Sequence, residues 1–403
     1  MAVHQAHEET NHNESLGLMV MQFGQFLNHD FMLTATQGKQ CCDQTVSGPD
    51  SEQPEELRFC FNIDISNDVF YSGKRSCFPF TRSDATCTES GQREQFNMLT
   101  AFIDGSAVYG SNSAKAEKLR TKTGGLLRTH YLGPTLPSNE QTGFADPFPP
   151  FASEQLIAGD FRATEQPGLA AIHSLFVLEH NRIANEFTGA DPSLTDEEVY
   201  QTARSLVGAQ IQNIAYTEFL PAVLGPAAMG FYNLSLPTEG TTVYNSSINP
   251  NVFNEVATFA FRFGHSLIPN FFNTAAQPLD TMKDICPLKD NFFQFEEFVV
   301  GKDFSGKAWQ NLLLGISSSQ SPPMDAKLSD HISNFLFCES DCDLSQGFGQ
   351  DLAARNIQRG RDHGLPGYVK YRELCGLTIP TSWEDKPEQI SQTNWDNMRS
   401  VYT

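Results

Sequence analysis

Three polar side chains in the segment QFLNHD, residues 25–30, have the spacing to share one face of a helix. Gln25, Asn28 and His29 lie at positions i, i+3 and i+4, which are neighbours on a helix surface. Together they would line a pocket with one imidazole base and two amides. Asp30, the next residue, would point away from that face and could bind something else.

A second histidine lies far downstream in the apolar stretch FAFRFGHSLI, three residues after Arg262. A neutral imidazole in such a setting suits an axial ligand of haem iron, although an isolated histidine is more often an ordinary core residue. Arg262 favours the ligand interpretation for His265, because a buried arginine needs an anion such as a haem propionate. Asn356 is a candidate hydrogen-bond acceptor for the other ring nitrogen, which would raise ligand basicity.

Arg162, in the segment RATE, could complement His29 in cleaving the O–O bond of a peroxide. That reaction needs a base that takes a proton from one oxygen and returns it to the other. It also needs fixed positive charge where negative charge develops. The competing interpretation is that Arg162 only pairs with Asp160 on the surface.

Asp30 and the loop TAFIDGS, residues 100–106, form a third candidate site. Alternate residues of an extended loop share a side, and their hydroxyl, carboxylate and backbone carbonyl oxygens are hard ligands that suit calcium. The residues on that side are Thr100, Phe102, Asp104 and Ser106. The competing interpretation is an ordinary turn capped by an aspartate.

Composition and charge limit the class of protein. The 403 residues are 39% hydrophobic and 19% charged, which suits a globular protein with a core. The net charge of −21 argues against nucleic acid and anionic membrane surfaces as partners. No apolar run approaches the length of a membrane span, and the start MAVHQAHEET lacks the apolar region of a signal peptide.

The cysteines nevertheless indicate an extracellular protein. Five of the nine lie in one loop-rich stretch, without the paired spacing of a zinc site, so disulfides are the better interpretation. These are Cys41, Cys42, Cys60, Cys77 and Cys87. Sequons at Asn13, Asn233 and Asn245 agree weakly with secretion. We expect a secreted protein whose export signal lies outside this chain.

Hydrophobic periodicity predicts the elements that must position these residues. Helices are expected over 14–35, 167–187, 194–216 and 250–267. Residues 106–120 should lead into a short helix after the turn at 109–111, residues 341–366 should pass from a loop into a helix, and the rest should be loosely helical. Residues 36–92 should form an irregular, disulfide-tied loop, and 124–160 an excursion over the surface. Because period-two alternation is almost missing, we expect one large, mostly α domain over 1–403 with long irregular loops and little β.

Six segments of the chain resemble the animal haem peroxidases, the group that includes peroxidasin, peroxinectin and myeloperoxidase. In the order and spacing of that family they are MVMQFGQFLNHD, REQFNMLTAFIDGSAVYGS, AGDFRATEQPGL, LEHNRIANE, FAFRFGHSLI and ARNIQRGRDHGLPGY. The resemblance covers nearly the whole chain, which makes it specific.

The resemblance implies a role for most of the candidate residues. His29 corresponds to the distal base, Arg162 to the distal arginine, and His265 to the proximal iron ligand of haem b, with Asn356 as its hydrogen-bond partner. Gln25 corresponds to a distal glutamine associated with water and halide binding. The implied calcium site comprises Asp30, Thr100, Phe102, Asp104 and Ser106.

Covalent attachment of the haem is expected to be limited. Glu165 corresponds to a carboxylate that esterifies a haem methyl, but Asn28 replaces the aspartate that forms a second ester. Gln166 replaces the methionine that gives myeloperoxidase its third linkage. We therefore expect at most one ester, through Glu165. The family also continues beyond Cys375, and nine cysteines is an odd count, so the chain is expected to be incomplete at both ends.

The implied function is that of a peroxidase: hydrogen peroxide oxidises the haem to a ferryl state, which then oxidises a halide, thiocyanate, phenol or tyrosyl group. One alternative is a peroxinectin-like adhesion or matrix protein with extracellular or cell-surface partners. The presence of His29, Arg162 and His265 and the lack of an RGD argue against it. Another alternative is a fatty-acid dioxygenase of the same superfamily, against which the calcium loop and RGRDHGLPGY weigh.

Overall fold

The computed structural model describes residues 16–36, 41–42, 59–71, 73, 75–87, 91–143, 155–236, 244–276, 281–301, 307–338 and 349–402. The α-helices are α1 (Leu18–Phe31), α2 (Ser106–Tyr109), α3 (Ser113–Leu119), α4 (Asn139–Thr142), α5 (Pro167–Ala190), α6 (Asp196–Ile214), α7 (Leu220–Phe231), α8 (Asn254–Thr258), α9 (Ala308–Ser318), α10 (Asp330–Ser333), α11 (Leu352–Asp362), α12 (Tyr368–Leu374) and α13 (Gln392–Val401). Phe161–Thr164, Ala260–Leu267 and Leu288–Asp290 are 3₁₀ turns, and Ala215–Phe219 and Glu296–Val300 are π turns.

Short antiparallel pairs make up the β-structure of the described residues. They are β1 (Ile63–Asp64) with β2 (Cys77–Phe78), β3 (Ala85–Cys87) with β4 (Arg93–Gln95), and β5 (Phe271–Ala276) with β6 (Thr281–Pro287). The expectation of a mostly α fold with little β is therefore confirmed.

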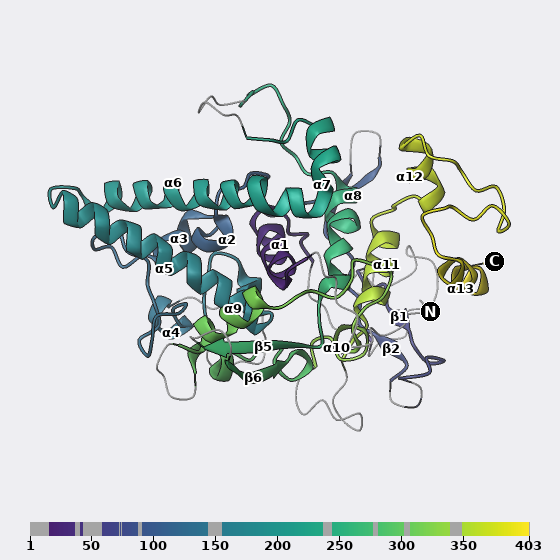
Figure 1. Cartoon of the computed structure of the whole chain (residues 1–403), viewed down its shortest axis with the longest axis horizontal. Helices are drawn as coiled ribbons and strands as arrows, with labels where there is room; N and C mark the ends of the chain where they lie inside the picture. The colour runs from purple at the N-terminus through teal and green to yellow at the C-terminus, as the bar shows by residue number, and fades with distance from the viewer. Residues whose placement is uncertain are drawn as a thin grey trace.

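Helix α1 lies at the centre of the molecule, with α5 and α6 side by side along one flank (Figure 1). Nine of its fourteen residues are buried. Phe26 is fully buried, and its ring stacks on that of Phe176 in α5 at 4.7 Å between centroids. Burying an aromatic side chain of this size contributes on the order of 2 kcal/mol. The helix carrying the candidate base is thus fixed by the core itself.

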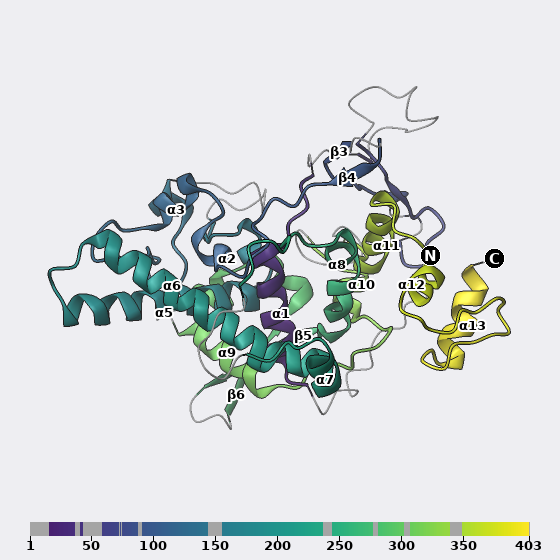
Figure 2. The same cartoon turned by 90° about the horizontal axis from the view of Figure 1, so that it is seen from above.

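The hairpin β5–β6 packs beneath α9, which in turn contacts α5. A side chain at Gly315 in α9 would place its Cβ 1.7 Å from the carbonyl oxygen of Asn273 in β5, so only glycine permits this approach. Helices α12 and α13 extend away from the other helices, on the side of the molecule opposite to α5 and α6, as Figure 2 shows from above.

Three local expectations need correction. The described parts of the segment 124–160 do not run over the surface, because Leu127, Leu136 and Ile157 are buried in the main core. Residues 144–154 of this segment lie outside the described residues. The single helix expected over 250–267 is interrupted at Phe259, whose φ of −137° ends α8 before the 3₁₀ turn Ala260–Leu267 begins. The bonds Cys41–Cys60 and Cys42–Cys77 confirm the expected disulfides for four of the five cysteines in the stretch 36–92. For Cys87 the expectation is wrong, because this cysteine is free and exposed.

Candidate active site

One cavity of about 330 Å³ brings the two distant halves of the candidate site together. Its lining includes, from the first half, Gln25, Asn28, His29, Arg162 and Glu165, and from the second half Arg262, His265, Arg355, Asn356 and Arg359. Aromatic and aliphatic side chains line the rest of the cavity. A concave, largely apolar pocket with a few convergent polar groups is the usual form of a cofactor site.

The wall that carries His29, here called the distal wall, consists of α1 and the turn Phe161–Thr164. His29 is buried, and its Nδ1 atom has no hydrogen-bond partner among the described residues. Burial, and next the positive charge of Arg162, holds the pKa of His29 well below its usual value. The imidazole is therefore neutral at physiological pH and available as a base.

Arg162 does pair with Asp160, but the pair is inside the molecule rather than on the surface. Asp160 is buried and accepts from Nε and from an Nη of Arg162, both at 2.8 Å, as well as from its backbone N–H. Burial would raise the pKa of Asp160, yet the arginine holds it below its usual value. The backbone carbonyl of Met32, where α1 ends, accepts a further bond at 3.0 Å. The guanidinium is thus held at the edge of the cavity in one orientation.

Glu165 is joined to the distal wall through Gln25, which donates to its carboxylate at 2.8 Å. Burial raises the pKa of Glu165 to about 7, against the opposing charge of Arg162. Asn28 also lines the cavity.

The opposite wall, here called the proximal wall, consists of the 3₁₀ turn Ala260–Leu267 and α11. A 3₁₀ turn has three residues per turn, so Arg262 and His265 still share a face, although the element is not the α-helix we expected. Burial, followed by the charge of Arg262, lowers the pKa of His265 to about 3. Its imidazole is therefore neutral, as a metal ligand must be.

Asn356 connects the two proximal residues. Its Oδ1 accepts from Arg262 at 2.8 Å, and its Nδ2 lies 2.8 Å from Nδ1 of His265. We expected the amide oxygen to face the imidazole, but the nitrogen does so because the oxygen is occupied by Arg262. Burial lowers the pKa of Arg262 to about 10, and its Nε has no partner within the described part of the chain. A bound anion would give the Nε of Arg262 the hydrogen-bond partner that it lacks among the described residues.

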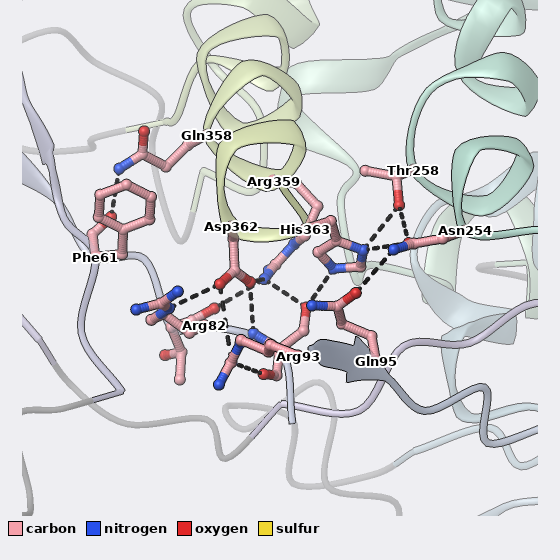
Figure 3. Close-up of polar contacts among 12 residues, drawn as sticks. Phe61, Arg82, Arg93, Gln95, Asn254, Thr258, Gln358, Arg359, Asp362 and His363 are labelled. Carbon is pink, nitrogen blue, oxygen red and sulfur yellow. Dashed lines mark hydrogen bonds and ion pairs between the residues drawn. The ribbon is translucent and has the colours of Figure 1, made fainter. Parts of the chain in front are cut away.

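A buried ionic network, which the sequence did not reveal, supports the proximal wall (Figure 3). Asp362, at the end of α11, accepts from Arg82 at 2.8 Å, from the backbone N–H of Ser83 at 2.7 Å and from Arg359 at 3.1 Å. His363 contacts Ser83 through Nε2, and Asn254 and Thr258 of α8 through Nδ1. The network ties α11 to the element that leads directly into the His265 turn.

Several residues of the candidate calcium site lie close together, and calcium at this place stays a prediction. The carboxylate of Asp30 accepts from the backbone N–H groups of Asp104, Gly105 and Ala107, and its backbone carbonyl accepts from the Ser106 hydroxyl at 2.7 Å. The Thr100 hydroxyl lies 3.0 Å from the Asp104 carboxylate. Burial raises the pKa of Asp30 to about 6. Where the structure is described, no group of three or more His, Cys, Asp or Glu gathers in the manner of a metal centre.

Comparison with known proteins agrees with this geometry. The sequence model of the family described as animal haem peroxidase matches residues 1–403. The chain is 33% identical to peroxidasin homolog pxn-2 of Caenorhabditis elegans, over 98% of this chain and 31% of that protein. It is 35% identical to mouse (Mus musculus) myeloperoxidase, over 93% of this chain and 52% of that protein. It thus spans about a third to a half of these curated relatives.

Solved structures show the same fold. Peroxidase A from Dictyostelium discoideum superposes with a TM-score of 0.78 at 27% identity, over 99% of this chain and 73% of that chain. A fatty acid alpha-dioxygenase from Oryza sativa superposes with a TM-score of 0.70 at 19% identity, over 99% of this chain and 64% of that chain. The second likeness concerns the fold alone.

Proposed function

The chain belongs to the animal haem peroxidase family, and we propose that it binds haem b in this cavity and uses hydrogen peroxide to oxidise a small electron donor. One observation carries the proposal. A single cavity holds a neutral base beside a fixed guanidinium on one wall and a neutral imidazole on the other. Peroxide cleavage at an iron centre requires these three groups: a general base, a fixed positive charge and a ligand for the iron.

The residues present fit a haem. His265 offers a neutral imidazole for the iron. Its Nε2 would bind the metal only with the proton on Nδ1, so the amide of Asn356 would have to present its oxygen to the ring, the reverse of the orientation found here. Arg262, which has an unpartnered buried Nε, together with Arg355 and Arg359 supplies positive charge for the two propionates. When bound, the haem would supply the redox-active iron, which no side chain of the protein can replace.

The distal residues would act on the peroxide itself. His29 would take the proton from one peroxide oxygen and return it to the departing oxygen. Arg162, which Asp160 prevents from turning away, would stabilise the negative charge on that oxygen. Gln25, fixed against Glu165, would orient the peroxide or a water molecule.

We further propose that Glu165 esterifies a haem methyl while Asn28 does not, and that Gln166 forms no sulfonium bond. An amide and a carboxyl differ in that only the carboxyl can form such an ester. Peptide mass spectrometry after peroxide treatment should find haem on the Glu165 peptide and none on the Asn28 peptide. Haem that is fully extracted by acidified solvent would show that the ester is absent.

Calcium is proposed at Asp30, Thr100, Phe102, Asp104 and Ser106. Hydroxyl, carboxylate and carbonyl oxygens gather there from two segments that lie about seventy residues apart in sequence. Because Asp30 follows His29, an ion at this place would hold the base as well as the loop.

The environment of the protein is proposed to be extracellular. Disulfides such as Cys41–Cys60 persist in oxidising compartments, and the sequons Asn233 and Asn245 lie at exposed positions, whereas Asn13 lies outside the described residues. No helix in the described segments is long and apolar enough to cross a membrane. A matrix or cell-surface partner remains a proposal from the resemblance.

The test is reconstitution of the whole chain with haemin. A Soret band that changes on addition of hydrogen peroxide, followed by oxidation of guaiacol, is the expected result. Oxygen consumption with arachidonate instead would favour the dioxygenase alternative. Haem binding without either reaction would favour the adhesion alternative, and failure to bind haem would refute the proposal. The donor in vivo, whether halide, thiocyanate, phenol or tyrosyl, is to be found with the same assay.

A further inference from the structure

A chain of side-chain amides runs from the start of α5 to the distal wall. Gln166 is the N-cap residue of α5, and its Oε1 accepts from the backbone N–H of Gly168 at 2.7 Å. Its Nε2 donates to Oε1 of Gln25 at 3.0 Å and to Oε1 of Gln22 at 2.8 Å. Gln25 in turn donates from Nε2 to Glu165 at 2.8 Å.

The backbone N–H of Gly168 is the first donor in this series of hydrogen bonds, and it fixes the donor and acceptor roles in every later bond of the series. The oxygen and nitrogen of an amide side chain are often assigned only from their neighbours. Here a backbone N–H can only donate, so the oxygen of Gln166 must face Gly168 and its nitrogen must face Gln25. The oxygen of Gln25 is then occupied, and its NH₂ group must face Glu165 and the cavity.

Burial and shape show that this arrangement is built into the fold. Gln166 is only 5% exposed, and Gln22 is fully buried. A Cβ atom at position 168 would lie 2.5 Å from Oε1 of Gln22 and 3.0 Å from Oε1 of Gln166, so glycine allows the amides to approach the helix end. The N-terminus of α5 carries partial positive charge, and the amides extend its donor character toward the cavity.

We propose that Gln166 is a positioning residue that sets the hydrogen-bond polarity of the distal wall, so that Gln25 presents an N–H donor to whatever occupies the distal side of the haem. The inference rests on the proposed function and extends it to a residue outside the described catalytic roles. Without Gln166, the amide of Gln25 could turn over and present its oxygen, which would repel an anion.

The sharpest test reverses the polarity with a change of one atom. In Gln166→Glu, one carboxylate oxygen still accepts from Gly168, but the other faces Gln25, which must turn its NH₂ group toward it. Gln22→Glu is the matched control, because it places the same charge beside Gln166 and leaves Nε2 of Gln166 free to donate to Gln25. The NH₂ group of Gln22 has no partner among the described residues, so no hydrogen bond is lost there. Gln166→Leu removes the clamp without adding charge.

The first measurement is fluoride binding to the haem-loaded whole chain, with the long-wavelength band of the ferric fluoride complex as a report on hydrogen bonds to the bound ion. Losing one hydrogen bond to a charged group should weaken fluoride about 10-fold or more in Gln166→Glu. Gln166→Leu should lie between this variant and the wild type, and Gln22→Glu should stay within about twofold of wild type. Equal affinities in all four folded proteins would overturn the inference.

The second measurement needs no haem. The protonated carboxyl of Glu165 gives an infrared C=O band, which Glu165→Gln identifies by its loss. Arg162, Asp160, Arg262 and Gln25 face this carboxyl. A reversed Gln25 offers it an acceptor, so the midpoint for loss of this band should move to higher pH in Gln166→Glu than in Gln22→Glu. Equal midpoints would refute the reversal, whereas a wild-type chain that takes up no haem would refute only the proposed function.

Discussion

The two walls of the cavity differ in what holds their functional side chains. On the distal wall, other protein groups hold Arg162 and Gln25: Asp160 and Met32 fix Arg162, and Gln166 and Glu165 fix Gln25. His29 is held by burial, since its Nδ1 has no hydrogen-bond partner among the described residues. On the proximal wall, Asn356 is shared between Arg262 and His265, and Arg262 keeps a buried N–H without a partner in the described chain.

The packing of the two walls differs in the same direction. Nine of the fourteen residues of α1 are buried, but only two of the eight residues of the turn Ala260–Leu267 are. The distal wall is therefore part of the protein core, whereas the proximal turn faces the cavity and is anchored from behind by α11. We infer that the distal wall is preorganised by the protein, and that the cofactor itself would complete the proximal wall.

The largest expected effect is that of His265→Ala, which would break the proximal wall. Loss of an iron ligand should weaken haem binding by more than the roughly 10- to 100-fold that follows loss of a supporting partner. Titration with haemin, followed through the Soret band, measures the affinity. His29→Ala is the control from the other wall and should bind haem normally. An unchanged spectrum in His265→Ala would show that another residue binds the iron.

Removal of the distal base should affect the reaction and leave haem binding intact. Stopped-flow mixing of His29→Ala with hydrogen peroxide should show the Soret change slowed about 10²- to 10⁴-fold. Arg162→Gln should slow it about 10²- to 10³-fold, the usual effect of removing one electrostatic contact to the transition state. Wild-type rates in both variants would contradict the preorganised distal wall.

The sequence predicted the distal wall better than the proximal one because of the kind of periodicity involved. Gln25, Asn28 and His29 need both i+3 and i+4 neighbours, which only an α-helix provides. Arg262 and His265 lie three positions apart, and this spacing puts two residues on one face of an α-helix and of a 3₁₀ turn alike. The break at Phe259 has no glycine or proline to announce it.

Other features depended on contacts between residues far apart in sequence. The hairpin strand Phe271–Ala276 is buried on both faces in places, so it lacks the alternation by which strands are recognised. Asp362 lies 280 positions from Arg82, and Gln166 lies 141 from Gln25, and neither pairing leaves a signal in one sequence. The pairing of Asp30 with its loop could be anticipated from the hard oxygen ligands that both supply and from the family resemblance, but not from any local pattern.

Substitutions of Asn356 would distinguish the contribution of the iron ligand His265 to haem binding from the contribution of the residue that orients it. Asn356→Leu should weaken haem binding about 10- to 100-fold, because His265 loses the group that orients its ring. Asn356→Asp should restore much of the affinity, since a carboxylate can accept from both Arg262 and the imidazole. The iron–histidine stretch in resonance Raman spectra should differ among the three proteins. Identical stretches would show that Asn356 does not act through His265.

Calcium should stabilise the distal wall and have little effect on the proximal one. At 100 times its dissociation constant, an ion bound only by the folded state adds about 2.7 kcal/mol to the free energy of unfolding. Chelation, or Asp104→Ala, should therefore lower the melting temperature and slow the peroxide reaction, with haem affinity little changed. Elemental analysis that finds no calcium in the pure protein would refute the site.

The smallest expected effect concerns Glu165 in the haem-free protein. Burial raises the pKa of this carboxyl from 4.5 to about 7, so the folded chain keeps a proton that the unfolded chain releases. The resulting stabilisation is fully present below pH 4.5 and is lost as the pH rises through 7. Glu165→Gln keeps an acceptor for Gln25 but cannot ionise, so its free energy of unfolding should rise relative to wild type as the pH increases through 7. Urea unfolding at several pH values measures the difference.

Glu186→Gln, which changes an exposed carboxylate on α5, is the matched control and should show no such trend. If wild type and Glu165→Gln kept a constant difference from pH 5 to 9, this carboxyl would already be ionised in the folded protein, and the distal wall would need a charged partner for it even without haem.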